Sequence, residues 1–186
     1  MTRSVRILWK IVFGTLALVI VLFLATNFGL LGKMPSIEDL QNPSASIASE
    51  VYADDGTPMG KFYLEDRSPV AYKDISPFVI KALVATEDER FYEHSGIDGK
   101  SLLRAVKGII TFNPAGGAST ISQQLALNLF GGQRASNKLS RGVQKLKEWI
   151  IAVKLERNFT KDEIITYYLN TVAFGDNVYG IRNAAR

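Results

Sequence analysis

The carboxylate of Glu87 occupies an unusual position for a charged residue. Ser76 followed by Pro77 predicts a helix start, and the helix is expected to continue to about residue 91. Apolar residues recur along it at spacings of three and four, and Glu87 falls in the same series. The apolar members are Ile80, Leu83, Val84 and Phe91. A carboxylate among apolar groups has its charged form disfavoured, which suits a general base or acid. A salt bridge at the helix end is the alternative.

A second carboxylate, Glu148, ends a row of basic residues on a helix expected from Asn137 to about Leu155. The row consists of Arg134, Lys138, Arg141 and Lys145, with Lys147 alongside. The opposite face is expected to pack inward through Leu139, Val143, Leu146, Ile150 and Val153. Cations would hold Glu148 ionised, and two carboxylates in opposite environments are typical of acid–base pairs. A solvated basic face is the simpler interpretation of this row.

A glycine-rich turn runs into a third helix, expected over residues 119–130, whose first turn is rich in hydroxyls and amides. The residues concerned are Gly117, Ser119, Thr120, Gln123 and Gln124. Backbone N–H groups at such a turn can receive a phosphate, and the side chains suit sugar hydroxyls. The segment is not a nucleotide-binding P-loop, because no Gly-Lys-Ser/Thr follows. Ordinary helix capping is the alternative, and a structural role is the simpler interpretation of His94.

The elements that must position these residues form one domain with a small appendage. The 186 residues are 47% hydrophobic and 22% charged, which suits a packed core. The absence of cysteine excludes disulfides and thiol nucleophiles, and a single histidine excludes sites that need two. Residues 33–99 carry 6 basic and 13 acidic side chains, whereas residues 100–186 carry 13 basic and 5 acidic ones. The basic half suggests an anionic ligand, either nucleic acid or a phosphate-bearing lipid.

A membrane segment decides between those ligands. Residues 11–32 carry no charge and would span about 33 Å as a helix, enough for a bilayer core. Arg3, Arg6 and Lys10 precede this segment and predict that residues 1–10 are a cytoplasmic tail, with residues 33–186 outside. A cleaved signal peptide is the alternative, but no clear cleavage site follows. An external domain does not meet the chromosome, so we expect no nucleic-acid partner.

The remaining elements complete a mainly α fold with a small N-terminal β appendage. Residues 33–46 are expected to be a linker, and residues 47–72 are β-like, with a turn at 54–56. A helix is expected over residues 101–112, with Leu102, Leu103, Val106, Ile109 and Ile110 facing inward. Thr160 with Glu163 is a capping box that opens a last helix, ending near Asn170. Residues 175–180 are expected to form a loop.

Four ordered motifs resemble the signatures of the peptidoglycan glycosyltransferases (glycosyltransferase family 51). Glu87-Asp88-x-x-Phe91-x-x-His94-x-Gly96 is similar to the first and Gly117-x-Ser119-Thr120-Ile121-x-Gln123-Gln124-Leu125 to the second. Lys145-x-x-Glu148 is similar to the third, and Lys161-x-x-Ile164-Ile165-x-x-Tyr168-Leu169-Asn170 to the fourth. The resemblance covers about residues 47–186, expected to be the glycosyltransferase domain, and extends to the N-terminal part of class A penicillin-binding proteins.

The resemblance implies a lysozyme-like domain on the outer face of the cytoplasmic membrane that polymerises lipid II, with inversion, into β-1,4-linked glycan and releases polyprenyl pyrophosphate. It implies that Glu87 is the base, and that Glu148 organises the donor pyrophosphate, with a divalent cation (Mg or Mn) as a possible aid. Lys145 would stabilise the leaving group. The expected partners are lipid II, the growing strand, the membrane and a cell-wall synthesis complex. The expected substrate-binding residues are Asp88, Phe91, His94, Gly117, Ser119, Thr120, Gln123, Gln124, Arg141, Lys145 and Asn170.

Departures from the family pattern leave two alternatives open. Gln144 stands where the third motif usually has Arg, for which Arg141 would compensate, and Leu127 stands where the second motif usually has Lys. The chain ends at Arg186, where family members continue, so we expect a fragment of a longer protein. A lysozyme-like lytic hydrolase and an inactive fragment that binds lipid II or cell wall are the alternative functions.

Overall fold

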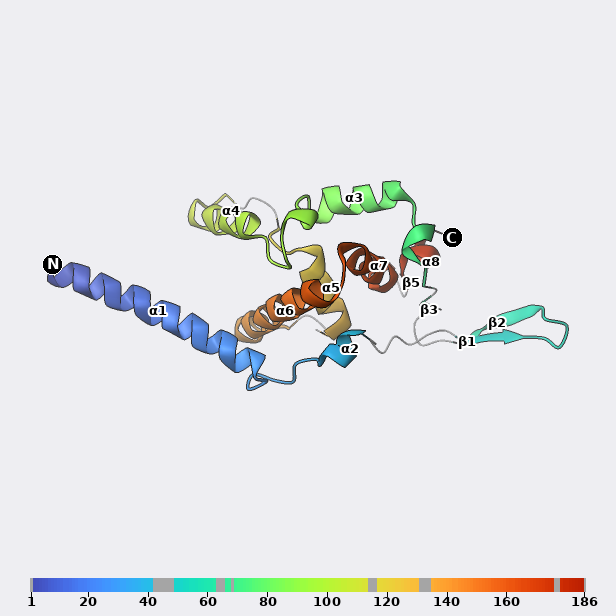
Figure 1. Ribbon diagram of the computed structural model, residues 1–186, viewed down its shortest axis with the longest axis horizontal. Coiled ribbons are helices and arrows are strands. Elements are labelled where there is room, and N and C mark those ends of the chain that lie inside the picture. The colour runs from blue at the N-terminus through green and yellow to red at the C-terminus, as the bar shows by residue number, and fades with distance from the viewer. Residues whose placement is uncertain are drawn as a thin grey trace.

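The computed structural model describes residues 2–41, 49–62, 66–67, 69–113, 117–130, 135–175 and 178–185. Part of the predicted linker, residues 47–48, 63–65 and 68 of the predicted β region, Arg134 and residues 176–177 of the predicted loop lie outside this set. The described chain is mainly helical with two small sheets, which confirms the predicted fold class. Three helices lie at its centre, with a long helix extending to one side and a β-hairpin to the other (Figure 1).

The central helices are α5 (Ile121–Phe130), α6 (Lys138–Asn158) and α7 (Lys161–Thr171), and they enclose the core. Its least exposed apolar side chains include Ile121, Leu125, Leu155, Ile164 and Ile165. Each such residue stabilises the fold by about 1.5–3 kcal/mol through the removal of apolar surface from water. The predicted capping box is confirmed at the start of α7, where the Thr160 and Glu163 side chains each accept from the other's backbone N–H.

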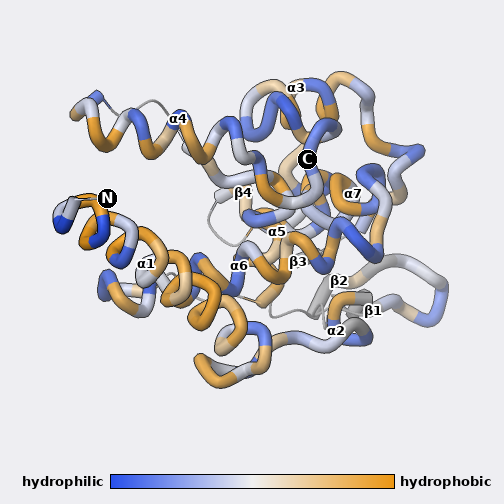
Figure 2. The backbone as a smooth tube through the Cα atoms, turned by 60° about the vertical axis from the view of Figure 1, so that its left-hand side comes forward, coloured by the Kyte–Doolittle hydropathy of each residue, from blue (hydrophilic) through white to orange (hydrophobic). Residues whose placement is uncertain are grey.

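Helix α1 (Arg3–Asn27) is the one described helix that is long and apolar enough to cross a membrane. Hydrophobic residues run along its length (Figure 2). It begins before the predicted span of 11–32 and ends earlier, because the chain turns at Gly29 and Gly32, where φ is +77° and +112°. The predicted linker is partly structured, since α2 (Ile37–Gln41) places Leu40 in the core at 1% exposure.

The end of α1 is docked against α6. The rings of Phe23 and Trp149 lie 6.1 Å apart between centroids, and Thr26 is fully buried. Just beyond the helix, the Lys147 ammonium lies so close to the Gly32 backbone that a Cβ added there would be 2.6 Å from Nζ. The apolar helix is therefore packed against the same helix that carries Glu148.

The two sheets are small. Strands β1 (Ser49–Tyr52) and β2 (Pro58–Phe62) pair antiparallel, with Ser49 opposite Phe62, and form the predicted appendage. The second sheet has the order β3-β5-β4, from β3 (Asp66–Arg67), β5 (Val178–Tyr179) and β4 (Ala173–Gly175), and β3 runs parallel to β5. Residues 175–180 are therefore not wholly a loop, because strand pairing continues into them. A short helix, α8 (Ile181–Ala184), follows.

Helix α3 (Pro77–Glu87) begins as predicted, with the Ser76 hydroxyl accepting from the N–H of Phe78, and η1 (Tyr72–Asp74) precedes it. It ends at Glu87 rather than near Phe91, because Asp88 is extended and a 3-10 turn, η2 (Phe91–Glu93), follows.

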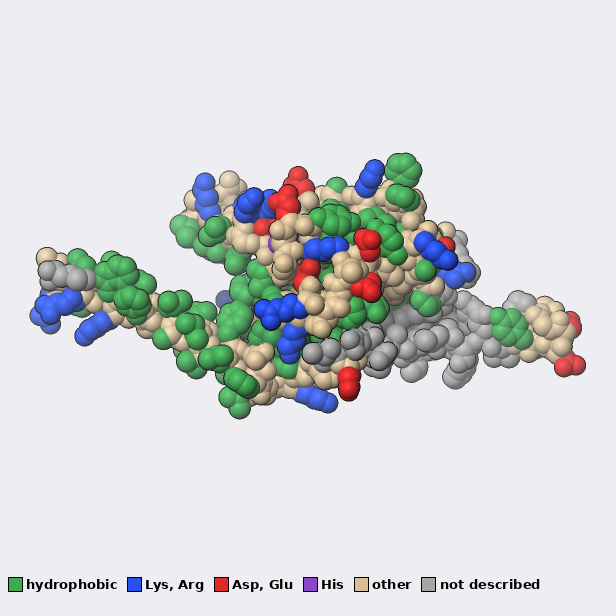
Figure 3. Space-filling view, in the orientation of Figure 1, with side chains coloured by type: hydrophobic (Ala, Val, Ile, Leu, Met, Phe, Trp, Pro, Cys, Tyr) green, Lys and Arg blue, Asp and Glu red, His purple; other side chains and the backbone are tan. Residues whose placement is uncertain are grey.

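Helix α4 (Gly99–Ile110) starts earlier than predicted because Asp98, rather than Ser101, caps it. The prediction that its apolar face packs inward is wrong. Leu103 is 72% exposed and Ile109 is 73% exposed, and Val106 and Ile110 are also exposed. Figure 3 shows hydrophobic side chains gathered on the surface of α1 and on the outward end of α4. The helix extends from the body on the same side as α1 (Figure 1).

Candidate active site

Glu87 is the last residue of α3, and its side chain is exposed. The prediction that it lies on a buried face is wrong, because the helix ends there and no further turn carries it inward. Its Oε2 atom accepts a hydrogen bond of 2.8 Å from Nε2 of Gln124 on α5. The Gln124 Oε1 atom accepts one of 3.0 Å from the hydroxyl of Tyr168 on α7. The carboxylate is therefore exposed to solvent but held on one side by two helices.

Asp88 joins the end of α3 to the start of α5. Its buried carboxylate accepts from the backbone N–H of Ile121 at 3.1 Å and lies 3.0 Å from Nε2 of His94. These contacts satisfy one of the free N–H groups at the start of α5. Asp88 and His94 therefore help to bring Glu87 and Gln124 together. The contact agrees with a structural interpretation of His94, and its expected substrate-binding role stays a prediction.

Glu87 opens onto a cavity of about 370 Å³, which we call the Glu87 cavity. The predicted site residues that line it are Glu87, Asp88, Gly117, Ser119, Thr120 and Gln124. Its other polar lining includes residues that the sequence reasoning did not single out, namely Arg90, Asp98, Ser101 and Arg104. A helix-capping signal at Asp98 could have found part of this group. The cavity is lined by carboxylates, among them the exposed Glu87 and Glu89, and by hydroxyls, an amide and two guanidinium groups.

The two arginines are held by the start of α4. Arg90 donates to Asp98 at 2.6 Å and to the Ser101 hydroxyl at 2.9 Å, and Arg104 donates to the same hydroxyl at 3.1 Å. Burial opposes the ionisation of Asp98, but hydrogen bonds from Ser101 and Arg90 and the Arg90 charge outweigh it and lower the pKa of Asp98 to about 2. Asp98 is therefore ionised at neutral pH and fixes this wall of the cavity.

Glu148 is buried, at 5% exposure, on the inward side of α6. Lys145 donates to its Oε2 atom and to the Ser119 hydroxyl, both at 2.8 Å. The predicted inward row of α6 is wrong, because the face that is buried carries Glu148, Ile151, Ala152 and Leu155, whereas Leu139 is exposed. The ion pair with Lys145 makes this burial tolerable, since a buried charge needs a partner.

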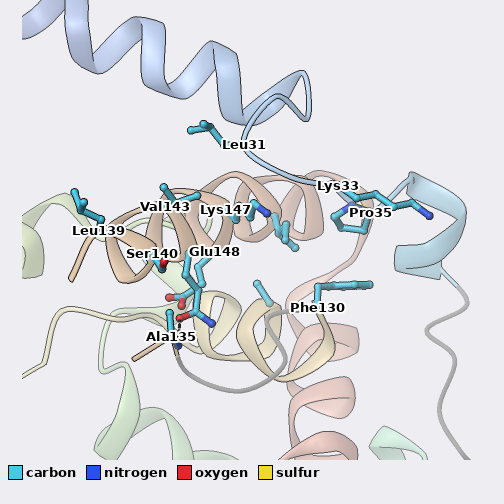
Figure 4. Close-up of a pocket in the computed structure, with 13 residues that line it drawn as sticks. Leu31, Lys33, Pro35, Phe130, Ala135, Leu139, Ser140, Val143, Lys147 and Glu148 are labelled. Carbon is cyan, nitrogen blue, oxygen red and sulfur yellow. Dashed lines mark hydrogen bonds between the residues drawn. The ribbon is translucent and has the colours of Figure 1, made fainter. Parts of the chain in front are cut away.

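A second cavity, of about 540 Å³, lies between α6, α5 and the segment that follows α1, and we call it the Glu148 cavity (Figure 4). Its lining includes Leu31, Pro35, Phe130, Val143, Lys147 and Glu148. In Figure 4, Glu148 points from α6 toward Ala135. Lys145 bridges Ser119, which lines the Glu87 cavity, and Glu148, which lines this one. One ammonium group therefore lies at the boundary between the two cavities.

Three of the predicted substrate-binding residues make structural contacts within the fold. Phe91 is completely buried, and Lys161 lies over its ring at 4.2 Å. Gln123 is buried and donates to the Gly96 carbonyl at 3.1 Å. Asn170 pairs with both backbone groups of Val70, at 2.9 and 3.0 Å. These contacts give the three residues structural roles, and their expected contact with substrate stays a prediction. Arg141 donates to Gln144 at 3.4 Å.

Gly96 shows how closely the loop after α3 approaches α6. Its φ is +90°, and a Cβ there would lie 2.8 Å from the backbone carbon of Ala152. Only glycine fits both the left-handed conformation and this contact. The Gly96 carbonyl also accepts from the Thr120 hydroxyl at 2.8 Å, so the loop ties α6 to the start of α5.

The geometry suits the transfer of a group away from an anionic leaving group. One carboxylate is accessible for proton transfer, and a second is buried beside a lysine that can stabilise developing negative charge. Within the residues that the structure describes, no group of three or more Asp, Glu, His or Cys side chains could hold a metal ion. The family resemblance implies a contact between Glu148 and a cation that arrives with the diphosphate. In the structure the Glu148 carboxylate is paired with Lys145.

Comparison with known proteins matches this geometry to a family. The family model described as Transglycosylase matches residues 55–186, which include most of the chain and both Glu87 and Glu148. Penicillin-binding protein 1F of Bacillus subtilis is 42% identical over 139 residues, which are 74% of this chain and 19% of that protein. Penicillin-binding protein 1A of Pseudomonas aeruginosa is 34% identical over 185 residues, 99% of this chain and 22% of the relative.

Penicillin-binding protein 1A of Escherichia coli is 36% identical over 155 residues, 83% of this chain and 18% of the relative. The chain thus spans about a fifth of the length of these curated relatives. Since the family match covers more than half of the chain and all four motifs, this chain belongs to the transglycosylase family.

Proposed function

We propose that this chain is a peptidoglycan glycosyltransferase that polymerises lipid II into β-1,4-linked glycan. The observation that carries the proposal is the placement of Glu87 and Glu148 on two cavities that Lys145 connects. A polymerase that joins two lipid-linked sugars needs one site for the acceptor hydroxyl and one for the donor diphosphate. Two adjacent cavities with different carboxylate environments meet that need.

Glu87 acts as the base in the Glu87 cavity. Its carboxylate takes the proton from the acceptor 4-hydroxyl, and that oxygen attacks C1 of the donor sugar, so a C–O bond forms with inversion. The bond between C1 and the diphosphate oxygen breaks, and its electron pair leaves with the polyprenyl diphosphate. An exposed carboxylate held by Gln124 can meet an incoming hydroxyl without rearrangement.

Lys145 stabilises the charge that develops on the diphosphate. It lies between Ser119 and Glu148, and the buried Glu148 carboxylate fixes its ammonium in place. A preorganised cation in a partly dry site acts more strongly than one in water. The Ser119 hydroxyl, which accepts from Lys145, can donate its own proton on the same side.

A divalent cation, if the reaction uses one, would reach this site bound to the diphosphate. Glu148 offers one carboxylate, and magnesium commonly binds through one or two carboxylates together with substrate phosphates. The cation would supply further neutralisation of the leaving group. Glu148 would orient that complex, while Glu87 and Lys145 keep the roles given above.

The catalytic part acts at the outer face of the cytoplasmic membrane, with α1 as a single-pass anchor and the N-terminus inside. Arg3, Arg6 and Lys10 support this orientation. We further propose that the exposed apolar face of α4 dips into the outer leaflet, since α4 extends on the same side as α1. Because the chain has no cysteine, single cysteines at Val106 and Met59 can carry probes. Lipid-borne quenchers should reach a probe on Val106 but not one on the hairpin.

Polymerisation of purified lipid II by the whole chain in detergent tests the activity. The chain should produce long glycan, and Glu87→Gln should slow it by about 10²- to 10⁴-fold, because the amide cannot accept the proton. Lys145→Met should also reduce the rate, whereas Glu93→Gln, an exposed carboxylate on η2, is the matched control and should not.

Product size separates the alternatives. Shortened fragments from cell wall, rather than polymer from lipid II, would mean a lytic hydrolase. Binding of lipid II without turnover in the whole chain would mean a binding fragment. Polymer from both the parent chain and Glu87→Gln would show that Glu87 is not the base.

A further inference from the structure

A chain of two hydrogen bonds links Tyr168 in the core to Glu87 at the surface. The Tyr168 hydroxyl lies 3.0 Å from Oε1 of Gln124. The Nε2 atom of the same amide lies 2.8 Å from Oε2 of Glu87. Each residue comes from a different helix: α7, α5 and α3. Tyr168 is buried at 5% exposure, so its position is fixed by packing.

The chemistry of the three groups allows one arrangement when Glu87 is ionised. A carboxylate only accepts hydrogen bonds, so the amide must turn its NH₂ group toward Glu87. The amide oxygen then faces Tyr168, whose hydroxyl must donate. Burial and the nearby Glu87 charge raise the pKa of Tyr168 to about 12, so this hydroxyl keeps its proton at any working pH. The opposite amide orientation would set two acceptors against each other.

We propose that Tyr168 is a positioning residue that acts through Gln124 to hold Glu87 in its reactive orientation. The inference rests on the proposed role of Glu87 as the base. Because the relay engages Oε2 and Glu87 lines the cavity, we assign Oε1 as the atom that meets the acceptor hydroxyl. An exposed glutamate otherwise samples many rotamers. The relay restricts the rotamers of Glu87 before substrate binds, so binding does not have to supply that ordering.

Tyr168→Phe tests the proposal because it removes one oxygen atom and keeps the buried ring. We expect kcat for lipid II polymerisation to fall about fivefold to tenfold with little change in KM, as for the loss of one hydrogen bond that matters in the transition state. Tyr167→Phe makes the same chemical change at the next residue, whose ring packs on Phe159 at 5.3 Å, and should leave kcat unchanged.

Two further readouts separate positioning from packing. The acid limb of the kcat profile should move to higher pH in Tyr168→Phe, because a carboxylate that loses a well-oriented donor holds its charge less firmly. In a double-mutant cycle, Tyr168→Phe should have no further effect on kcat in a Gln124→Ala background. Additive losses in that cycle, or an unchanged kcat and acid limb in Tyr168→Phe, would overturn the proposal.

The failure of this proposal is distinguishable from failure of the proposed function. If Glu87→Gln polymerises as fast as the parent chain, the role of Glu87 falls and the relay falls with it. If Glu87→Gln is inactive and Tyr168→Phe matches the parent, only the relay is wrong. Independently of turnover, the isotope-labelled side-chain amide signal of Gln124 should respond to titration of Glu87 in the parent chain. That response should weaken in Tyr168→Phe, and equal responses would contradict the relay.

Discussion

The central helices and helix α4 differ in where their apolar side chains lie. In α5, α6 and α7 the apolar residues are buried against each other, and the buried Glu148 is paired with Lys145. In α4 the apolar residues lie on the surface, although the helix is capped and held by Asp98. Glu87 lies where these two regions meet. Glu87 is thus supported by the packed central helices on one side and lies near α4, with its exposed apolar face, on the other.

The largest expected effect contrasts one leucine from each region. Leu125→Ala removes a fully buried side chain between the central helices and should destabilise the fold by about 2–5 kcal/mol. Leu103→Ala makes the same change on the exposed face of α4 and should alter stability by no more than about 0.5 kcal/mol. Denaturant unfolding in detergent measures both, and equal losses would mean that α4 is packed in solution.

A smaller effect on stability is expected at the start of α4, where Asp98 caps the helix. Asp98→Asn weakens the cap of α4 and removes the ion pair with Arg90, which should cost about 1–3 kcal/mol. Since the pKa of Asp98 is lowered in the folded state, its contribution is complete above about pH 4 and is lost as the pH falls toward about 2. Acid unfolding should therefore show a steeper loss of stability in the parent chain than in the variant.

The smallest effect on the fold is expected from charging the α4 face. In Leu103→Glu with Ile109→Glu, unfolding in detergent should be nearly unchanged, because both side chains are exposed. Polymerisation in lipid vesicles should nevertheless fall by about tenfold, since charged side chains resist insertion among lipid tails. Tyr52→Glu with Met59→Glu, on the exposed β-hairpin, makes the same kind of change away from α4 and serves as the matched control. A similar loss in detergent would point to damaged packing instead of lost lipid contact.

Local signals in the sequence predicted several elements well. Ser76 with Pro77 and Thr160 with Glu163 marked the starts of two helices, because capping depends on neighbouring residues alone. Spacing was a poorer guide to burial. Glu87 shares the apolar spacing of its helix but is exposed, because the helix stops and the series has no further turn to pack.

Amphipathic patterns gave the wrong inward face twice. On α4 the apolar stripe was expected in the core, yet it is exposed, since periodicity shows that a face is apolar but not what covers it. On α6 the buried face includes Glu148, because a paired charge can be buried where a pattern search expects only apolar residues. The Tyr168–Gln124–Glu87 relay was likewise beyond prediction, since it joins residues from three helices.

The docking of α1 against α6 through Phe23 and Trp149 has a kinetic consequence. A domain on a flexible linker would sample many orientations above a bilayer. It would meet a substrate in a productive orientation only part of the time. A domain packed against its membrane helix keeps one orientation relative to the membrane plane. Each collision in that plane then starts from the same orientation. Under the proposed function, the search for a lipid-linked substrate would then be one of position in the membrane plane alone, and successive additions would extend a strand along a constant direction.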